Sequence, residues 1–184
     1  MTKMSYWGRH GKTGPGGEKG FTLMELLITV GLSALLTGAI LAALTTSRQV
    51  CATVTADQDL QQTANVIMNK IIKGSAETGG TFRFSEAVSY TITSISDLNF
   101  IGTDGTTRRY FQSNNELWYN HPVGGNPTDE LLYRAPAGTT LTVRFWPEST
   151  NITIGIDVGL SRAVNGRTAT GSATTMITIR NHVT

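Results

Sequence analysis

Residues 20–44 read GFTLMELLITVGLSALLTGAILAAL, and this stretch decides how the rest of the chain is organised. The nineteen residues from 26 to 44 carry no charge, and Glu25 is the only charged residue between Phe21 and Ser47. A helix needs about twenty apolar residues to cross a lipid bilayer. The stretch therefore predicts a membrane-spanning helix over residues 23–46.

The residues before this stretch are basic. This segment has four basic residues and one acidic residue, Glu18; the basic ones are Lys3, Arg9, Lys12 and Lys19. The whole chain has a formal net charge of +2, so the remainder without this segment has a net charge of −1. An excess of Lys and Arg keeps its side of a membrane helix in the cytoplasm. We therefore expect a cytoplasmic N-terminus with the C-terminal bulk across the membrane. Because the basic residues cluster there, no nucleic-acid partner is expected for the folded part.

Three kinds of N-terminal segment combine a basic start with an apolar run. A secretory signal peptide has a core of about 7–15 apolar residues with a small-residue cleavage site after it, and the run here is longer. A plain single-pass anchor explains the length but not Glu25, because a carboxylate near the membrane is costly unless it is paired. The third kind is a precursor that is cut before its apolar run.

The motif GFTLMELL at residues 20–27 resembles the cleavage and methylation motif of type IV prepilins and type II secretion pseudopilins. It combines Lys19 and Gly20 before the junction, Phe21 after it, and Glu25 four residues further on. The resemblance implies that residues 1–20 are a leader, which a membrane prepilin peptidase removes between Gly20 and Phe21. It also implies N-methylation of Phe21. In this chemistry the chain is a substrate, so we do not expect an enzyme. Translation from Met4 is an alternative start.

Glu25 has a specific role in this family. The resemblance implies that Glu25 of an incoming subunit pairs with the new amine of Phe21 on a neighbouring subunit, which sets the register between their helices. Opposite charges attract strongly where little water screens them, and either charge alone is penalised there. The pair would therefore act in assembly.

Small residues are spread along the apolar stretch. Small side chains let helices approach closely in lipid and in bundles, so we expect Gly31, Ala34, Gly38 and Ala42 to pack against neighbouring helices. The single cysteine, Cys51, excludes an intrachain disulfide. We interpret it as a small apolar residue on the helix.

The helix continues beyond the membrane, because no proline occurs between Phe21 and Gly74. A spacing of 4, 3 and 4 residues predicts one apolar stripe on a helix, and it is formed by Leu60, Ala64, Ile67 and Ile71. We therefore expect one long helix over residues 21–75, with its second half packed on a sheet.

Residues 76–184 are rich in Thr, Ser, Gly and aromatic residues, which favours strands. Hairpin turns are expected at Asp104-Gly105, Asn114-Asn115 and Asn165-Gly166. Successive hairpins packed on a helix indicate an α+β fold with an antiparallel β head. The expected strands are 87–93, 97–102, 106–112, 115–120, 130–134, 140–146, 151–158 and 173–180.

The order of residues 97–118, with Asp104-Gly105 at a turn and Trp118 at the end, is similar to the first hairpin of minor pseudopilins and W-type minor pilins. The last strands are similar too. The resemblance implies a filament subunit whose partners are the peptidase, other pilin or pseudopilin subunits and an inner-membrane assembly platform. It implies a bacterial inner-membrane precursor that later joins the filament. A type II secretion pseudopilus subunit and a tip subunit for adhesion or DNA uptake remain alternatives.

Residues that could carry other chemistry are scattered. His10, His121 and His182 do not have zinc-ligand spacing, and we interpret His121, which precedes a proline, as a surface loop residue. Asp104 and Asp157 are weak candidates for a calcium site. No metal or cofactor is expected.

The charged pairs in the head also have plain interpretations. Asp129 and Glu130 are adjacent on an expected strand, so their side chains point to opposite faces. Arg108 and Arg109 precede two aromatic residues, and we interpret this cluster as a solvated hairpin. We expect Trp118 in the core or at an interface, and the same holds for Trp146.

Overall fold

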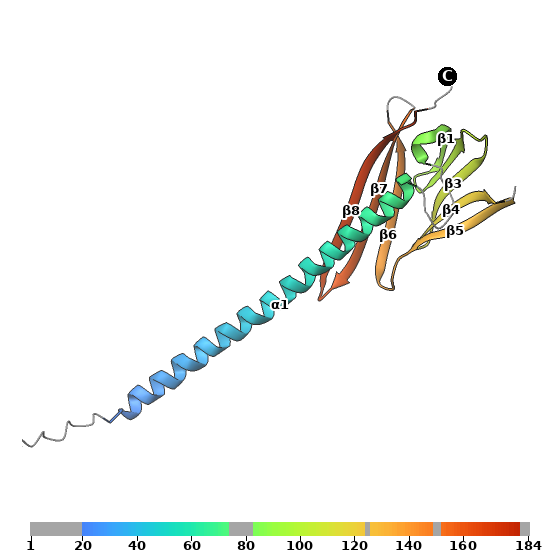
Figure 1. Cartoon of the computed structure of the whole chain (residues 1–184). Coiled ribbons are helices and arrows are strands. Elements are labelled where there is room, and N and C mark those ends of the chain that lie inside the picture. Colours follow the sequence, from blue (N-terminus) through green and yellow to red (C-terminus); the bar gives the residue numbers. More distant parts are fainter. Residues whose placement is uncertain (1–19, 74–82, 124–125, 149–151, 181–184) are drawn as a thin grey trace, which may run out of the picture. The chain divides into compact units, whose positions relative to one another are not determined.

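The computed structural model describes residues 20–73, 83–123, 126–148 and 152–180. These residues form an α+β fold: a long α-helix, a short 3-10 helix and eight β-strands in two antiparallel sheets (Figure 1). The chain divides into two compact units within the helix, between Thr45 and Thr46. The second unit, which holds both sheets, is called the head below.

Helix α1 runs from Leu23 to Lys73. It starts two residues later than expected, and its predicted continuation to residue 75 lies outside the described residues. The predicted apolar stripe is confirmed, since all four of its side chains are buried in the head. Each fully buried Leu or Ile contributes roughly 1.5–3 kcal/mol relative to exposure, so this stripe holds α1 to the sheets. Its members are Leu60, Ala64, Ile67 and Ile71.

The first sheet has five strands in the order β1-β2-β3-β4-β5, each antiparallel to the next. A short 3-10 helix, η2 (Phe84–Glu86), leads into it. The strands are β1 (Ala87–Ser94), β2 (Asp97–Gly102), β3 (Thr107–Ser113), β4 (Glu116–Val123) and β5 (Asn126–Arg134).

The second sheet has three strands, β6 (Thr139–Pro147), β7 (Thr153–Val164) and β8 (Arg167–Thr178). A two-residue turn joins β7 and β8, and both Asn165 (φ 51°) and Gly166 (φ 76°) have positive φ there. This geometry is typical of the hairpin turns that Asn-Gly favours. The predicted turn at this position is therefore confirmed.

Every expected strand overlaps an observed one, but four of them extend at least three residues further than the sequence indicated. β4 ends at Val123, β5 begins at Asn126, β7 continues six residues past the expected end at residue 158, and β8 begins at Arg167. The missed parts contain glycine, alanine, asparagine, aspartate and proline, which are depleted in strands. Pairing with β7 along its full length holds β8 in place instead.

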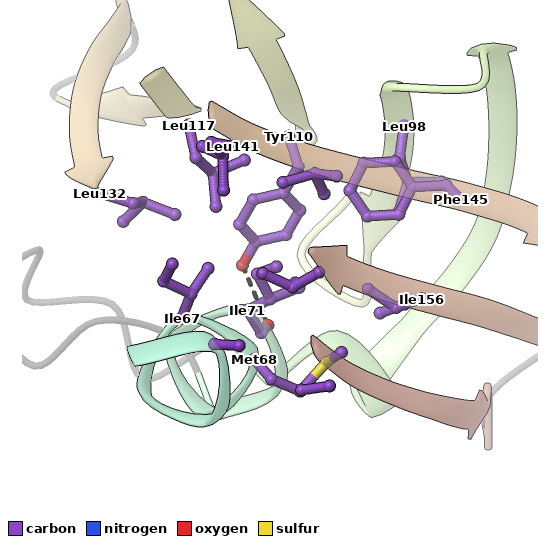
Figure 2. Close-up of a cluster of buried hydrophobic side chains, with 14 of the residues drawn as sticks. Ile67, Met68, Ile71, Leu98, Tyr110, Leu117, Leu132, Leu141, Phe145 and Ile156 are labelled. Atoms are coloured by element: carbon purple, nitrogen blue, oxygen red, sulfur yellow. Dashed lines mark hydrogen bonds between the residues drawn. The ribbon is translucent and has the colours of Figure 1, made fainter. Parts of the chain in front are cut away.

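The core lies where α1 meets both sheets (Figure 2). Ile67 and Ile71 of α1 face the buried side chains of the first sheet and those of β6 and β7. The hydroxyl of Tyr110, on β3, donates a hydrogen bond of 3.2 Å to the carbonyl of Ile71. This bond satisfies a carbonyl in the last turn of α1, where helical partners run out. Burial raises the pKa of the Tyr110 hydroxyl, so it stays a donor.

Side chains close the edge of the second sheet at β8. The backbone N–H of Thr170 donates to the Asp57 carboxylate at 2.7 Å. Gln61, one helical turn further on, bonds Ser172 twice: it accepts from the N–H at 3.1 Å and donates to the carbonyl at 2.5 Å. Two residues of α1 therefore replace a neighbouring strand at this edge.

The opposite edge of that sheet, at β6, is closed by the first sheet. Gln112 accepts from the Val143 N–H at 2.7 Å and donates to the Leu141 carbonyl at 2.8 Å. The carbonyl of Ile95, in the turn between β1 and β2, accepts from the Phe145 N–H at 2.7 Å. These bonds join the two sheets and leave fewer unpaired backbone groups at the edge.

The approach of β8 to α1 requires glycine at position 171. A Cβ atom there would lie 2.2 Å from the carbonyl carbon of Leu60 and 2.3 Å from the nitrogen of Gln61. Both are backbone atoms of α1, so they cannot move aside as a flexible side chain would. Gly171 therefore sets the distance between strand and helix.

We expect Gly171→Ala to destabilise the head by about 1–3 kcal/mol, because the added methyl forces β8 away from α1. Denaturant unfolding of the full chain in detergent, followed by tryptophan fluorescence, measures this. Gly159→Ala on β7 is the matched control, since a Cβ there would meet its nearest atom at 3.9 Å. Equal stability of the two variants would contradict the assigned role of Gly171.

Candidate functional site

The start of α1 is fixed by a side-chain cap. The hydroxyl oxygen of Thr22 accepts a hydrogen bond of 3.2 Å from the backbone N–H of Glu25. A threonine immediately before a helix, bonded to the third helical N–H, is an N-cap. Glu25 therefore occupies the first turn, where the positive end of the helix favours a carboxylate.

The predicted cleavage bond lies just before this cap. Gly20 and Phe21 are outside the helix and exposed, and Phe21 as a whole residue is 75% exposed. The N-cap holds the helix start two residues beyond the Gly20–Phe21 bond. The bond therefore lies outside the regular helix.

The N-terminal half of α1 is apolar and uncovered. An 18-residue window has a mean hydropathy of 2.2, and none of it is buried. Within the described residues this is the one helix that is long and apolar enough to cross a membrane. Leaving so many large apolar side chains in water is unfavourable, so this half needs lipid or another apolar partner.

Hydroxyl side chains in this half are bonded within the helix itself. Thr29 donates to the Glu25 carbonyl at 2.7 Å, Ser33 donates to the Thr29 carbonyl, and Thr37 donates to the Ser33 carbonyl at 2.8 Å. Unsatisfied polar groups cost several kcal/mol in hydrocarbon. These hydroxyls avoid that cost, so they are compatible with lipid.

The small residues predicted to pack against other helices all lie on this half and are exposed. A methyl group added at Gly31 or Gly38 would meet no atom within 4 Å in the described structure. Ala34 and Ala42 are equally uncovered. Their predicted role in packing therefore stays a prediction. Cys51 is on α1 as expected, and it is exposed.

The two adjacent arginines of β3 have separate ion-pair partners. Arg109 holds Asp97 through two contacts of 2.8 and 2.6 Å and lies 4.6 Å from the centre of the Phe111 ring. Arg108 holds Asp104 through contacts of 2.9 and 2.6 Å. Hydrogen bonds from Arg108 lower the pKa of Asp104. Both guanidinium groups are thus engaged with carboxylates of the head.

The calcium candidates are apart in the head: Asp157 is on a strand of the second sheet, and Asp104 is in a turn of the first. Asp157, on β7, accepts a hydrogen bond of 2.7 Å from the hydroxyl of Thr174. Asp104, in the turn between β2 and β3, also accepts from Thr106. Each carboxylate is therefore tied to neighbouring protein groups, and the structure does not combine them into one site.

The interpretation of His121 as a loop residue is wrong. It lies within β4, its side chain is 13% exposed, and it stacks on Tyr119 with ring centres 5.1 Å apart. Its Nε2 is 3.4 Å from the carboxylate of Glu130. Asp129 instead accepts from Asn120, so the predicted opposite orientation of Asp129 and Glu130 is confirmed. Strand β4 includes a proline, which concealed its length.

Trp118 and Trp146 are both half-buried. Trp118 stacks nearly parallel to Phe111, with ring centres 6.5 Å apart. The indole of Trp146 lies against Gly155, where a Cβ atom would come within 2.0 Å of the ring. Trp118 therefore packs on the first sheet, and Trp146 packs on the second.

Thr22 is the one site residue that sequence reasoning missed. Threonine followed three residues later by glutamate is the capping-box pattern that marks a helix start, and residues 22–25 have it. Comparison with known proteins adds no assignment, since no family model, curated protein or solved structure matches this chain.

The Asp104–Arg108 pair predicts a pH effect on stability. Folding lowers the pKa of Asp104, so its ionised carboxylate stabilises the folded state. This stabilisation is complete above the pKa of the unfolded chain, about 3.9, and is lost as the pH falls through the lower pKa of the folded state. We therefore expect the wild type to lose stability below about pH 4 more steeply than Asp104→Asn does. Urea unfolding at several pH values measures the difference, and parallel slopes would refute it.

Proposed function

We propose that this chain is a minor pilin or pseudopilin, a structural subunit of a type IV pilus-like filament. A prepilin peptidase cuts it between Gly20 and Phe21, Phe21 is N-methylated, and α1 drives assembly. Before assembly the chain is a single-pass protein of the bacterial inner membrane, with its head in the periplasm.

The observation that carries this proposal is the combination at the start of α1. An exposed Gly20–Phe21 bond precedes a capped helix. A carboxylate stands in its first turn, and an uncharged, uncovered apolar window follows. A signal peptide or a plain anchor explains the apolar window alone. A subunit that is cut and then packed into a bundle explains all of these features.

Glu25 is the residue on which register between subunits depends in this proposal. Cutting before Phe21 creates an ammonium group four residues from Glu25, in a region with little water. A charge there is stabilised by an opposite charge on a neighbouring subunit and is costly when left alone. The pair favours one axial offset between neighbouring helices over others.

Transfer of α1 from lipid to a helical bundle exchanges one apolar environment for another. The hydrophobic gain is therefore small, and packing must supply specificity. The small residues Gly31, Ala34, Gly38 and Ala42 fit that need, since they let helix backbones approach. Extraction from the membrane needs energy from elsewhere, and an assembly ATPase is the expected source.

A filament used for adhesion, motility or DNA uptake and a pseudopilus of type II secretion both accommodate this subunit. The basic-aromatic cluster of β3 does not favour a DNA-binding tip, because its two arginines are paired with Asp97 and Asp104. We therefore favour a structural subunit over a DNA-binding tip, both for a pilus and for a secretion pseudopilus.

N-terminal sequencing of the mature protein tests the class. In cells with the peptidase we expect a sequence beginning at methylated Phe21, and in cells without it an uncut chain. Membrane fractionation controls for insertion in both strains. An uncut N-terminus at Met1 or Met4 in the presence of the peptidase would refute the proposal.

Glu25→Ala tests the assembly role. We expect normal cleavage and membrane insertion but at least tenfold less incorporation into sheared filaments, because the Phe21 amine loses its partner. Immunoblotting of the filament and membrane fractions measures this. Glu86→Ala, in the head, is a control for the loss of a carboxylate. Wild-type incorporation of Glu25→Ala would eliminate the register role.

A further inference from the structure

An open groove of about 570 Å³ follows α1 where it runs beside β8. Its helical side is lined mainly by amide side chains, and Asp57 is the one charged residue among those that line it. The half-exposed side chain of Val66 also contributes. The amides are Gln58, Gln61, Gln62, Asn65 and Asn69.

Four of these amides form a straight row. Gln58, Gln62, Asn65 and Asn69 are spaced by 4, 3 and 4 residues, so they share one face of α1, and all four are exposed. The buried stripe has the same spacing and begins at Leu60, two residues later, which puts it on the far side of the helix. Exposed helical faces usually carry charged residues, whereas this one offers neutral donors and acceptors.

The same helix already binds an extended backbone. Asp57 and Gln61, four residues apart, bond Thr170 and Ser172, two residues apart on β8. The spacings match, because helical neighbours of this kind lie about 5–6 Å apart and alternate residues of a strand lie about 6.6 Å apart. Gln61 shows the full pattern, since its amide binds both the N–H and the carbonyl of Ser172.

We propose that the groove binds a polypeptide segment in extended conformation through its backbone. The amides at Gln58, Gln62 and Asn65 repeat the arrangement of Asp57 and Gln61 on the adjacent face of α1. Each amide has donors and an acceptor and can therefore pair with the N–H and carbonyl of one residue. A neutral groove of this kind selects for backbone geometry rather than for charged side chains.

This inference does not depend on cleavage at Phe21 or on Glu25. The ligand is defined by its chemistry: an extended segment with free backbone N–H groups at alternate positions. Recognition by added strand-like hydrogen bonding is a common way to bind peptides. A helix from another copy of the chain would instead bind the groove by side-chain packing. Removing backbone N–H groups from a bound peptide should therefore weaken an extended segment, whereas a bound helix would not depend on them.

The test uses the full chain in detergent micelles and a fluorescent seven-residue peptide, TATGSAT, which copies residues 168–174. We expect saturable binding, measured by fluorescence anisotropy. A peptide of the same composition in scrambled order should bind within about threefold, because the backbone is recognised. Two further peptides carry N-methyl groups on alternate backbone nitrogens, one on the odd positions and one on the even positions. One of the two should bind about tenfold more weakly than the unmodified peptide, because it loses the N–H groups that face the groove.

Variants of the chain complete the test. The double variant Gln62→Ala and Asn65→Ala should weaken binding about tenfold. Gln49→Ala removes an exposed amide of α1 outside the groove and should leave binding unchanged. Absence of saturable binding, or equal binding of both N-methylated peptides, would overturn the proposal. The groove would instead belong to a second copy of the chain if the chain self-associates, the double variant abolishes this self-association, and the peptide does not inhibit it.

Discussion

The head depends on the burial of one stripe of α1 between two sheets. Leu60, Ala64, Ile67 and Ile71 lie against both sheets, so neither sheet has a complete core without the helix. Hydrogen bonds from the same part of α1 hold β8, and the hydroxyl of Tyr110 holds the last turn of the helix. One continuous helix therefore provides the core of the head in its second half and an uncovered apolar surface in its first half.

The two halves of α1 reach stability in different ways. The second half buries one apolar stripe in the head, and its Asp57 and Gln61 bond to the edge of the second sheet at β8. The first half has apolar residues all round, with Thr29, Ser33 and Thr37 bonded back to the helix. Water suits one half and lipid or a helical bundle suits the other, which is the physical basis of the proposed filament role.

Sequence reasoning predicted the helix, its buried stripe, the Asn165-Gly166 turn and the α+β class, because these follow from local periodicity and turn chemistry. It did not predict the division into two sheets. That division depends on contacts far apart in sequence, such as Gln112 with Val143. The partners of Arg109 and His121 were missed for a similar reason, since cross-strand register decides them. The partner of Arg108 is local, because Asp104 lies four residues before it in the turn.

The closed edges of the second sheet have a consequence for the behaviour of the head at high local concentration. Unpaired strands invite other chains to add on and begin cross-β aggregates. At β8 the exposed backbone groups of Thr170 and Ser172 are occupied by α1, and at β6 those of Leu141 and Val143 are occupied by Gln112. These two edges are therefore less available for pairing with identical neighbours when heads are held at high local concentration.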